Sequence, residues 1–423
     1  MAIRNTHRSV PVYLHSATLQ EAHLLGVLNA DLVRGKEVFS YEYNAPWLES
    51  GRAQNLDPDL QLYSGPQYLS EGKSNFGIFL DSSPDRWGRT LMDRREAVLA
   101  RMEERKPSPL FETDYLLGVF DGHRMGALRF KENEKGPFLN NNKEMASPPW
   151  TSLPELEHAS LELEKDIAGD TEQMKWLNML MAPGSSLGGA RPKASVVDQK
   201  NQLWIAKFPS GNDKRDMGAW EFVTHQLAIN AGLNVPAAMA GKYYGHQHTF
   251  LTKRFDRTAE SGRIHFSSAM TLLGQTDGAD FRSGVGYLDL VEFISRNGAN
   301  VQGDLEELWR RIVFSICVSN TDDHLRNHGF LLTDGGWILS PAYDLNPVET
   351  GSGLSLNISE TDNAQELDLA IEVAPYFRVS EKRAGEIIEK IKASVGQWNT
   401  VAENQGISRM ERDGMSAAFR YWK

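Results

Sequence analysis

In the first 130 residues, hydrophobic positions recur in short runs separated by turn residues, a pattern typical of strands. The apolar run at 10–14 predicts one strand, and the alternating aromatic and polar positions at 39–43 predict another. The segment 44–48, which contains a proline, predicts a turn after the second strand. Capping residues and a proline shortly before residue 88 predict a helix over 88–102.

A hairpin is expected next, because apolar runs at 115–120 and 125–130 flank Asp121-Gly122, a dipeptide that favours a tight turn. Residues 131–154 are rich in Asn, Lys, Glu and Pro, which indicates a surface loop or linker. Residues 155–181 have a helical pattern that ends at Ala-Pro-Gly.

The rest of the chain divides into a mixed part and a mostly helical part. Between 185 and 251 the pattern predicts strands at 194–197, 203–208, 238–244 and 249–253 and a helix at 219–231. From 255 onward the pattern is mostly helical, with a polar segment at 320–328 and a short strand pair at 329–332 and 337–338.

Composition narrows the class of protein. The 423 residues, 40% hydrophobic and 24% charged, are typical of a globular protein with two or three domains. The chain has one cysteine, Cys317, so no internal disulfide can form and a reducing cytoplasm is the natural compartment. Cys317 lies in an apolar run, and we expect a core residue rather than a nucleophile.

Targeting and charge also limit the function classes. No apolar run near the start has the length of a signal peptide, and no run of 18 apolar residues predicts a membrane span. The formal charge of −11 argues against nucleic-acid binding over the whole surface. This net charge is compatible with a local basic patch or with DNA contact through a partner protein.

The segment 319–327, Ser-Asn-Thr-Asp-Asp-His-Leu-Arg-Asn, brings acids, amides and a histidine directly after an apolar helical stretch at 308–318. Asp322 and Asn327 have the D-x-x-x-x-N spacing of a kinase catalytic loop, in which the aspartate accepts the hydroxyl proton and the asparagine holds Mg²⁺. The same spacing also arises by chance in residues that cap a helix or line a turn. Further residues are therefore needed to support a kinase.

Asp344 lies 17 positions after Asn327, beyond the predicted strand pair, where it is placed to supply the second Mg²⁺ ligand. Phosphoryl transfer requires metal bridging of the phosphates, in-line positioning and an acceptor for the hydroxyl proton. Two acids and an amide oxygen provide these functions, since oxygen ligands suit Mg²⁺.

Upstream, the segment 185–193 predicts a turn rich in small residues, whose backbone N–H groups can approach phosphates closely. The turn lacks the Walker pattern G-x-x-x-x-G-K-[ST], which disfavours a P-loop NTPase.

Lys207 lies inside an apolar strand, where a lysine is costly unless paired, and Glu221 in the following helix is the expected partner. Taken alone, Lys207 fits the exposed face of an edge strand equally well. The segment 250–257 has the pattern of a strand that passes into the helical part, where an adenine-binding hinge would fall.

The chain resembles the HipA family of bacterial toxin kinases over nearly its whole length. The N-terminal part carries Phe39-x-Tyr41, Trp47-Leu48 and Phe79-x-Asp81-Ser82-x-Pro84-Asp85-Arg86-Trp87-Gly88-Arg89. The central part carries Ser186-x-x-Gly189-Ala190-x-Pro192-Lys193, Ile205-x-Lys207-x-Pro209, Gly232-Leu233-Asn234-Val235-Pro236 and Arg254-Phe255-Asp256-Arg257. The catalytic part carries Thr321-Asp322-x-His324-x-x-Asn327 and Pro341-x-Tyr343-Asp344.

The resemblance implies a bilobal, protein-kinase-like α+β fold with a β-rich N-terminal part and, apart from the short strand pair, an all-helical C-terminal lobe. The segments expected are a HipA-type N-terminal β-rich subdomain at 1–130, a linker with helices at 131–184, a kinase-like N-lobe core with the phosphate loop at 185–254, and a helical C-lobe with the catalytic residues at 255–423.

The resemblance also implies an ATP- and Mg²⁺-dependent serine/threonine protein kinase. Asp322 would be the proton acceptor, and Asn327 and Asp344 the Mg²⁺ ligands. The nucleotide-binding residues would be Gly188, Gly189, Ala190, Arg191, Pro192 and Lys193 in the phosphate loop, Lys207 on the phosphates, Lys253, Arg254 and Phe255 in the hinge, and His324, Asn327, Tyr343 and Asp344. Ser186 matches the serine that relatives autophosphorylate to inactivate themselves, although the neighbouring Ser185 leaves the assignment open.

Family members are toxins of type II toxin–antitoxin pairs. The resemblance therefore implies a helix-turn-helix antitoxin of the HipB type as partner, DNA contact only through that antitoxin, and no membrane. It implies a protein substrate, for example an aminoacyl-tRNA synthetase, and growth arrest. Two departures leave nucleotide and target preference open: Arg191 stands where a glutamine is common, and 263–268 lacks a common acidic residue.

Two other functions stay open. A small-molecule kinase of the aminoglycoside or choline kinase type shares the aspartate–asparagine arrangement. The second is a non-catalytic pseudokinase that acts as a corepressor. The argument against it is the presence of all four expected functional residues, Asp322, Asn327, Asp344 and Lys207.

Overall fold

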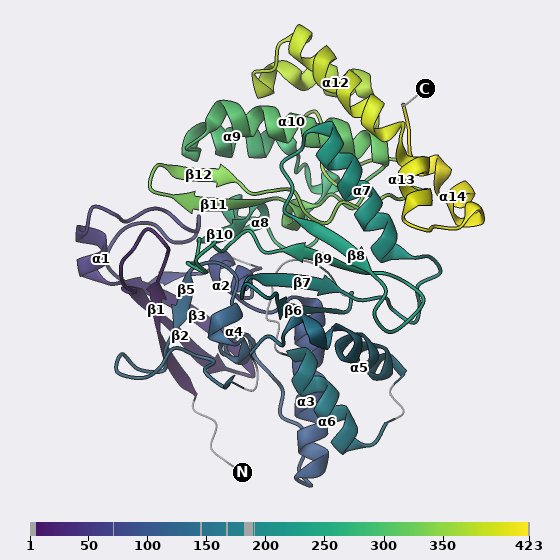
Figure 1. The fold of residues 1–423 in the computed structure, drawn as a ribbon. Coiled ribbons are helices and arrows are strands. Elements are labelled where there is room, and N and C mark those ends of the chain that lie inside the picture. The colour runs from purple at the N-terminus through teal and green to yellow at the C-terminus, as the bar shows by residue number, and fades with distance from the viewer. Residues whose placement is uncertain are drawn as a thin grey trace. The chain divides into compact units, whose positions relative to one another are not determined.

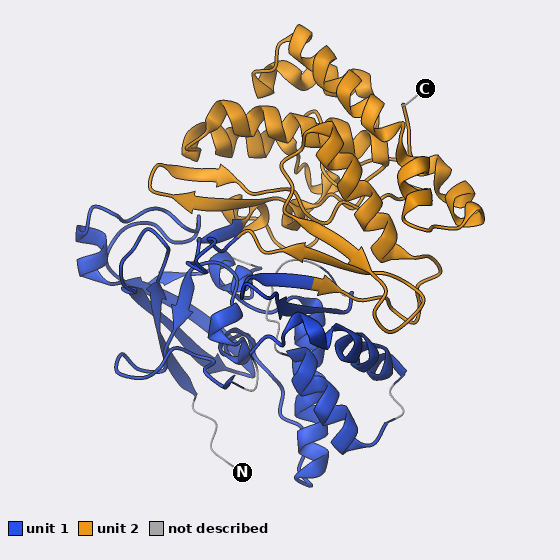
Figure 2. Cartoon of the chain, viewed as in Figure 1, with its two compact units in different colours: residues 1–205, 256–267 blue, residues 206–255, 268–423 orange. Residues whose placement is uncertain are grey.

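The computed structural model of the protein describes residues 6–70, 72–143, 146–165, 168–181, 189 and 191–421. The chain forms two compact units, shown in different colours in Figure 2. The first comprises residues 1–205 and 256–267, and the second comprises residues 206–255 and 268–423. The four segments predicted from the sequence are a finer division that these two units do not test.

A five-stranded antiparallel sheet organises the first unit, in the order β4-β3-β2-β1-β5. Strands β1, β2, β3 and β5 are labelled in Figure 1. Its strands are β1 (His7–Leu14), β2 (His23–Val33), β3 (Lys36–Tyr43), β4 (Gln67–Tyr68) and β5 (Leu128–Phe130). Phe39, Tyr41 and Tyr43 alternate toward the core, as a strand with one buried face requires. Arg34 and Gly35 link β2 to β3 in a two-residue turn, and both have positive φ, at 50° and 80°.

The helices of the first unit include a long helix that begins at a capping aspartate. Asp85 is the N-cap of α3, and its carboxylate accepts a hydrogen bond from the Gly88 backbone N–H at 2.8 Å. The helical elements are α1 (Ala45–Glu49), α2 (Gly77–Asp81), α3 (Arg86–Met102), α4 (Glu112–Gly118), η1 (Asp121–His123), η3 (Trp150–Ser152), α5 (Leu153–Lys165) and α6 (Asp170–Met181). The predicted helix over 88–102 is therefore confirmed.

Two predictions in this unit are wrong. Residues 115–120 lie largely in helix α4 rather than in a strand, and 121–123 form η1 instead of a hairpin turn. Arg124 explains the difference, because its fully buried guanidinium donates hydrogen bonds to the carbonyls of Leu116 and Val119, which a strand pair would have used. Residues 44–48 enter α1 rather than a turn, since a proline is compatible with the first helical turn. The helical pattern predicted over 155–181 is confirmed, and it forms two helices, α5 and α6.

The division between the two units falls within two strands, β7 (Leu203–Lys207) and β10 (Phe266–Ser268). Strand β6 (Lys193–Val197) belongs to the first unit. In the second unit, β8 (Ala238–Gly241) pairs antiparallel with β9 (Thr249–Lys253), and β11 (Gly329–Thr333) with β12 (Gly336–Leu339). The strands and the strand pair predicted in this part of the sequence are confirmed, although β8 ends before residue 244.

Helices form most of the second unit. They are α7 (Met217–Ala231), α8 (Ala269–Leu272), η4 (Phe281–Ser283), α9 (Tyr287–Asn297), α10 (Val301–Val318), η5 (Leu325–Asn327), α11 (Leu367–Val373), η6 (Ala374–Phe377), α12 (Glu381–Val395), α13 (Trp398–Asn404), α14 (Arg409–Met415) and η7 (Ser416–Ala418). No helix within the described ranges has both the length and the apolar character needed to cross a membrane.

The core of the second unit is built around α10, which packs against α7, α9, α11 and α12. Trp309, Phe314 and Cys317 are completely buried along it, and burial raises the pKa of the Cys317 thiol to about 12. Cys317 is therefore a core residue, as predicted. The same helix fixes the chain that follows β12, because Arg311 donates a hydrogen bond to the Ser340 carbonyl at 2.6 Å.

Candidate active site

Lys207, at the end of β7, lies between two carboxylates. Its Nζ is 2.6 Å from Glu221 Oε1 on α7 and 2.7 Å from Asp344 Oδ1, which follows β12. The three side chains are only 12%, 7% and 25% exposed. Burial alone would lower the pKa of Lys207, but the negative charges of Asp344 and Glu221 outweigh it and raise that pKa. The expected pairing of Lys207 with Glu221 is confirmed, and Lys207 carries a stable positive charge.

Asp344 adopts a left-handed backbone conformation with φ of 58°, which aspartate tolerates better than most residues. Its Oδ1 also accepts a hydrogen bond from Asn346 Nδ2 at 2.9 Å. Residues next to Asp344 form hydrogen bonds with the polar loop, residues 319–327. The Tyr343 hydroxyl donates to the Arg326 carbonyl at 2.7 Å. The Asn346 N–H donates to Asn320 Oδ1 at 3.3 Å. The structure thus brings Lys207, Asp344 and the polar loop together.

The polar loop begins where α10 ends, at Ser319 with φ of 49°. Asp322 is exposed, whereas the adjacent Asp323 is 3% exposed. Asn327 Nδ2 donates to the Asp322 carbonyl at 2.8 Å, and the Asn327 N–H donates to the His324 carbonyl at 2.8 Å. These two hydrogen bonds fold residues 322–327 into a compact turn with the aspartate and the asparagine at its ends.

The donor atoms near this turn suit a magnesium ion. Asn327 Oδ1 is buried and has no hydrogen-bond partner among the described residues, which is costly unless a ligand engages it. Asp344 supplies a carboxylate on the chain segment bound to the same loop. Mg²⁺ binds oxygen ligands, usually one or two from the protein with substrate phosphates and water completing the shell. Within the described ranges, no group of three His, Cys, Asp or Glu side chains offers a metal site of another type.

Asp323 is the residue of this loop whose role the sequence did not predict. The Tyr287 hydroxyl donates to Asp323 Oδ2 at 2.6 Å, and His328 Nε2 lies 3.0 Å from Asp323 Oδ1. Burial alone would raise the pKa of Asp323, but His328 and the hydrogen bonds to the carboxylate lower it. No sequence motif links Tyr287 to this loop, because it lies 36 residues upstream of Asp323.

Two of the residues predicted to bind the nucleotide are in contact with each other. The rings of Phe255 and Tyr343 are 5.5 Å apart with an interplanar angle of 32°. The Lys253 N–H donates to the Ala237 carbonyl at 2.8 Å, which continues the pairing of β9 with β8. Arg254 is 2% exposed, and His324 is half-buried with an Nδ1 that has no hydrogen-bond partner among the described residues.

The predicted phosphate loop is described only in part, and its described residues belong to the first unit. Ser185, Ser186, Gly188 and Ala190 lie outside the described residues. Gly189 has φ of 78°, Arg191 is half-buried and Pro192 is buried.

Lys193 is buried and its Nζ lies 2.7 Å from Asp85 Oδ2, the N-cap of α3. The Trp87 indole N–H donates to the Lys193 carbonyl at 3.1 Å. The first unit therefore anchors the last residue of the predicted loop. The proposed contact of Lys193 with phosphate stays a prediction.

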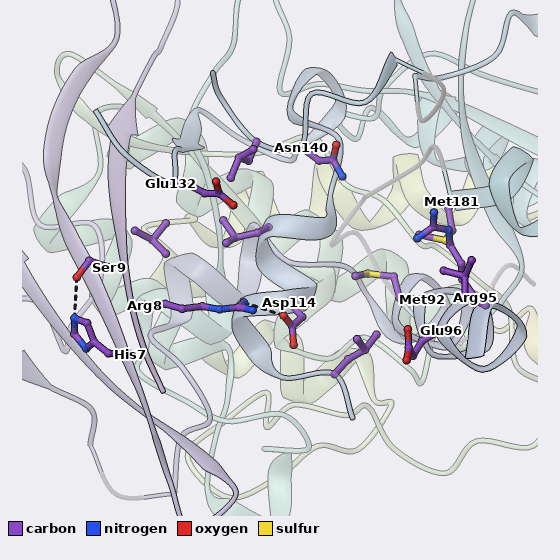
Figure 3. A pocket seen from close by; sticks show the side chains of 15 residues that line it. His7, Arg8, Ser9, Met92, Arg95, Glu96, Asp114, Glu132, Asn140 and Met181 are labelled. Atoms are coloured by element: carbon purple, nitrogen blue, oxygen red, sulfur yellow. Dashed lines mark hydrogen bonds and ion pairs between the residues drawn. The ribbon is translucent and has the colours of Figure 1, made fainter. Parts of the chain in front are cut away.

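The first unit also contains a cavity of about 800 Å³ beside β1, α3 and α4, seen closely in Figure 3. Arg8 crosses it and donates to Asp114 Oδ1 at 2.8 Å, which ties β1 to α4. None of the residues predicted for catalysis or nucleotide binding lines this cavity.

Comparison with known proteins matches residues 185–398 to the family described as the HipA-like C-terminal domain. A putative kinase of Haemophilus influenzae is 28% identical over 183 residues, which cover 39% of this chain and 53% of that protein. The putative kinase Y4dM of Sinorhizobium fredii is 29% identical over 212 residues, or 45% of this chain and 51% of that protein. The serine/threonine-protein kinase toxin HipA of Shewanella oneidensis is 24% identical over 231 residues, or 48% and 52%.

The chain thus spans about half the length of the curated relatives that it matches. Among solved structures, a chain of the Shewanella oneidensis complex of HipA, HipB and operator DNA superposes with a TM-score of 0.63 at 17% identity, covering 96% of this chain and 94% of that chain. The shared fold confirms the predicted α+β class. The match over residues 185–398 is half of the sequence, and the chain therefore belongs to the HipA-like C-terminal domain family.

Proposed function

We propose that the protein is an ATP- and Mg²⁺-dependent kinase that phosphorylates serine or threonine in a protein. The observation that carries this proposal is the ion-paired Lys207, held by Glu221 and Asp344 in the same unit as the D-x-x-x-x-N loop. A lysine, a helix glutamate and a metal-binding aspartate in this relation are the parts that protein kinases use to bind and orient the phosphates. Three relatives named as kinases support the same reaction type.

Asp322 is proposed as the acceptor of the proton from the attacking hydroxyl. Its side chain is exposed and can meet a substrate, whereas the Asp323 carboxylate is buried and already engaged by Tyr287 and His328. The hydrogen bond from Asn327 to the Asp322 carbonyl holds the backbone of this acceptor in place. The burial difference therefore favours Asp322 over its neighbour.

Asn327 and Asp344 are proposed to hold Mg²⁺, which when bound would neutralise charge on the phosphates. The unpartnered Oδ1 of Asn327 supports this assignment. Lys207 would bind the phosphates with its permanently charged ammonium. Phe255 and Tyr343, whose rings pack against each other, would bind the adenine together with Lys253, Arg254 and His324.

We further propose that the protein is the toxin of a toxin–antitoxin pair in a reducing cytoplasm, with a HipB-type antitoxin as partner and DNA contact through that antitoxin. A relative is named as a toxin kinase, and the solved structure with the same fold comes from a complex with HipB and operator DNA. Autophosphorylation would occur at Ser186 in the loop that also contains Gly188 to Lys193. A growth-essential protein, for example an aminoacyl-tRNA synthetase, would be the target.

The substrate class is tested by incubating the protein with γ-labelled ATP and either a cell extract or a panel of aminoglycosides and small alcohols. The proposal predicts label in protein serine or threonine, including the enzyme itself, and none in the small molecules. Lys207→Met should remove the labelling, and Lys200→Met, which changes an exposed lysine of the same chain, should not. Label in small alcohols without any labelled protein would overturn the proposal in favour of a small-molecule kinase.

A further inference from the structure

A buried contact between an aspartate and a histidine spans the polar loop from one end to the other. Asp323, which follows Asp322, pairs with His328, which follows Asn327, at 3.0 Å. The side chains of Asp323 and His328 are 5% and 2% exposed. The pair therefore joins the two positions adjacent to the proposed proton acceptor and the proposed metal ligand, and it closes the loop beneath them.

The carboxylate of Asp323 is fixed from two further helices. Tyr287, the first residue of α9, donates its hydroxyl to Oδ2 at 2.6 Å, and Ser315 of α10 contributes a weaker contact to the same oxygen at 3.4 Å. The Tyr287 ring also packs edge-on against the His328 ring at 5.7 Å. The His328 carbonyl accepts a hydrogen bond from the Ala269 N–H at 2.8 Å, which ties the far end of the loop to α8.

Burying the Asp323 carboxylate is a poor source of net stability, because removing its charge from water costs about as much as its contacts return. The contacts of this carboxylate nevertheless limit its orientation, since each of its oxygens has its own neighbour. Here, Tyr287 and His328 engage different oxygens of Asp323, so the carboxylate cannot rotate without breaking one of the two contacts. Rigidity of the loop, rather than stability of the fold, is the property this arrangement favours.

We propose that Asp323, His328 and Tyr287 are positioning residues that hold Asp322 and Asn327 at the separation that phosphoryl transfer requires. This inference rests on the proposed kinase function and adds residues outside the D-x-x-x-x-N motif to it. Small misplacements of a catalytic group reduce the rate of the chemical step steeply. Loss of the network should therefore lower kcat while the affinity for ATP, which depends on Lys207 and the adenine-binding residues, stays the same.

Tyr287→Phe is the sharpest test, because it removes one hydroxyl and leaves the ring in place. The matched control is Tyr43→Phe in the first unit, since the buried Tyr43 hydroxyl has no hydrogen-bond partner among the described residues. Steady-state phosphorylation kinetics and thermal unfolding are measured for both variants. We expect Tyr287→Phe to lower kcat about tenfold, the effect of one well-placed hydrogen bond, with KM for ATP within twofold of wild type. Tyr43→Phe should match wild type in both constants.

Asp323→Asn and the double variant Tyr287→Phe/Asp323→Asn complete the test. If the tyrosine acts through the carboxylate, the double variant should be no slower than Asp323→Asn alone. A Tyr287→Phe enzyme with wild-type kcat, or one that loses only thermal stability, would overturn the inference while the kinase function stands. A wild-type protein that transfers no phosphate from ATP to any acceptor would instead overturn the proposed function, and this inference with it.

Discussion

The ammonium of Lys207 lies 2.7 Å from the carboxylate of Asp344, although 137 positions separate the two residues in the sequence. The contact joins the end of β7 to the segment after β12, and Glu221 on α7 completes it from the other side. Two negative charges on one buried lysine leave that ammonium charged over the whole physiological range. A phosphate-binding cation and a metal-binding aspartate are thereby assembled before any ligand arrives, which reduces the reorganisation that binding requires.

Replacement of Lys207 should destabilise the protein as well as abolish activity. Lys207→Met leaves the Asp344 and Glu221 carboxylates close together without their cation, and we expect a loss of about 3 kcal/mol in the free energy of unfolding. The raised pKa of Lys207 gives this contribution a pH dependence. It is fully present below the unfolded pKa, near 10.5, and is lost as pH rises through the higher folded pKa.

Urea unfolding of wild type and Lys207→Met at pH 8 and at pH 11 measures this dependence. The difference between the two proteins should be large at pH 8 and smaller at pH 11. Lys200→Met serves as the control, because that lysine is exposed. A wild type no more stable than Lys207→Met at pH 8 would show that the ion pairs of Lys207 contribute nothing to the fold.

Asn327 variants should separate metal binding from loop structure. Asn327→Asp keeps an oxygen at the position of Oδ1 and loses the donor to the Asp322 carbonyl, whereas Asn327→Ala loses both. We expect Asn327→Ala to raise the Mg²⁺ concentration for half-maximal activity at least tenfold, and Asn327→Asp to raise it much less, because a carboxylate oxygen also binds Mg²⁺. The measurement is an activity titration with Mg²⁺ at saturating ATP. An equal increase in both variants would assign Asn327 a structural role only.

Ser186 variants test self-inactivation. A phosphate at this position adds about two negative charges next to a loop proposed to bind ATP phosphates, and repulsion should lower the affinity for ATP. Ser186→Ala should therefore keep its activity during prolonged incubation with ATP, while wild type declines. The progress curve of substrate phosphorylation measures this directly, with Ser185→Ala as the matched control. Self-phosphorylation that survives in Ser186→Ala and disappears in Ser185→Ala would move the modification site to the neighbour.

Local patterns in the sequence predicted the elements whose partners are close in the chain. The hairpin of β11 and β12 and the apolar helix α10 follow from alternation and helical spacing, and both were confirmed. The run at 115–120 has residues that favour strands, yet it lies largely in helix α4, because the buried guanidinium of Arg124 binds the carbonyls at its end. Such a contact depends on burial that propensity does not encode.

The candidate site shows the same limit. The D-x-x-x-x-N spacing selected Asp322 rather than Asp323, but it did not show that the two adjacent acids differ in burial. Burial separates them, and it is set by Tyr287 on α9 and by His328, neither of which forms part of a recognisable pattern. The pairing of Lys207 with Glu221 was predictable because a strand lysine followed by a helix glutamate is a local arrangement. The contact of Lys207 with Asp344 required the three-dimensional structure.

The central claim is tested most directly by mass spectrometry of phosphopeptides from the wild type and from Asp322→Asn, each incubated with ATP and Mg²⁺. The account predicts phosphorylated serine or threonine in the wild type and none in Asp322→Asn, with the affinity for ATP preserved within about twofold because Lys207, Asn327 and Asp344 remain. Phosphorylation of Asp322→Asn at the wild-type rate would contradict the account and show that Asp322 is not the proton acceptor.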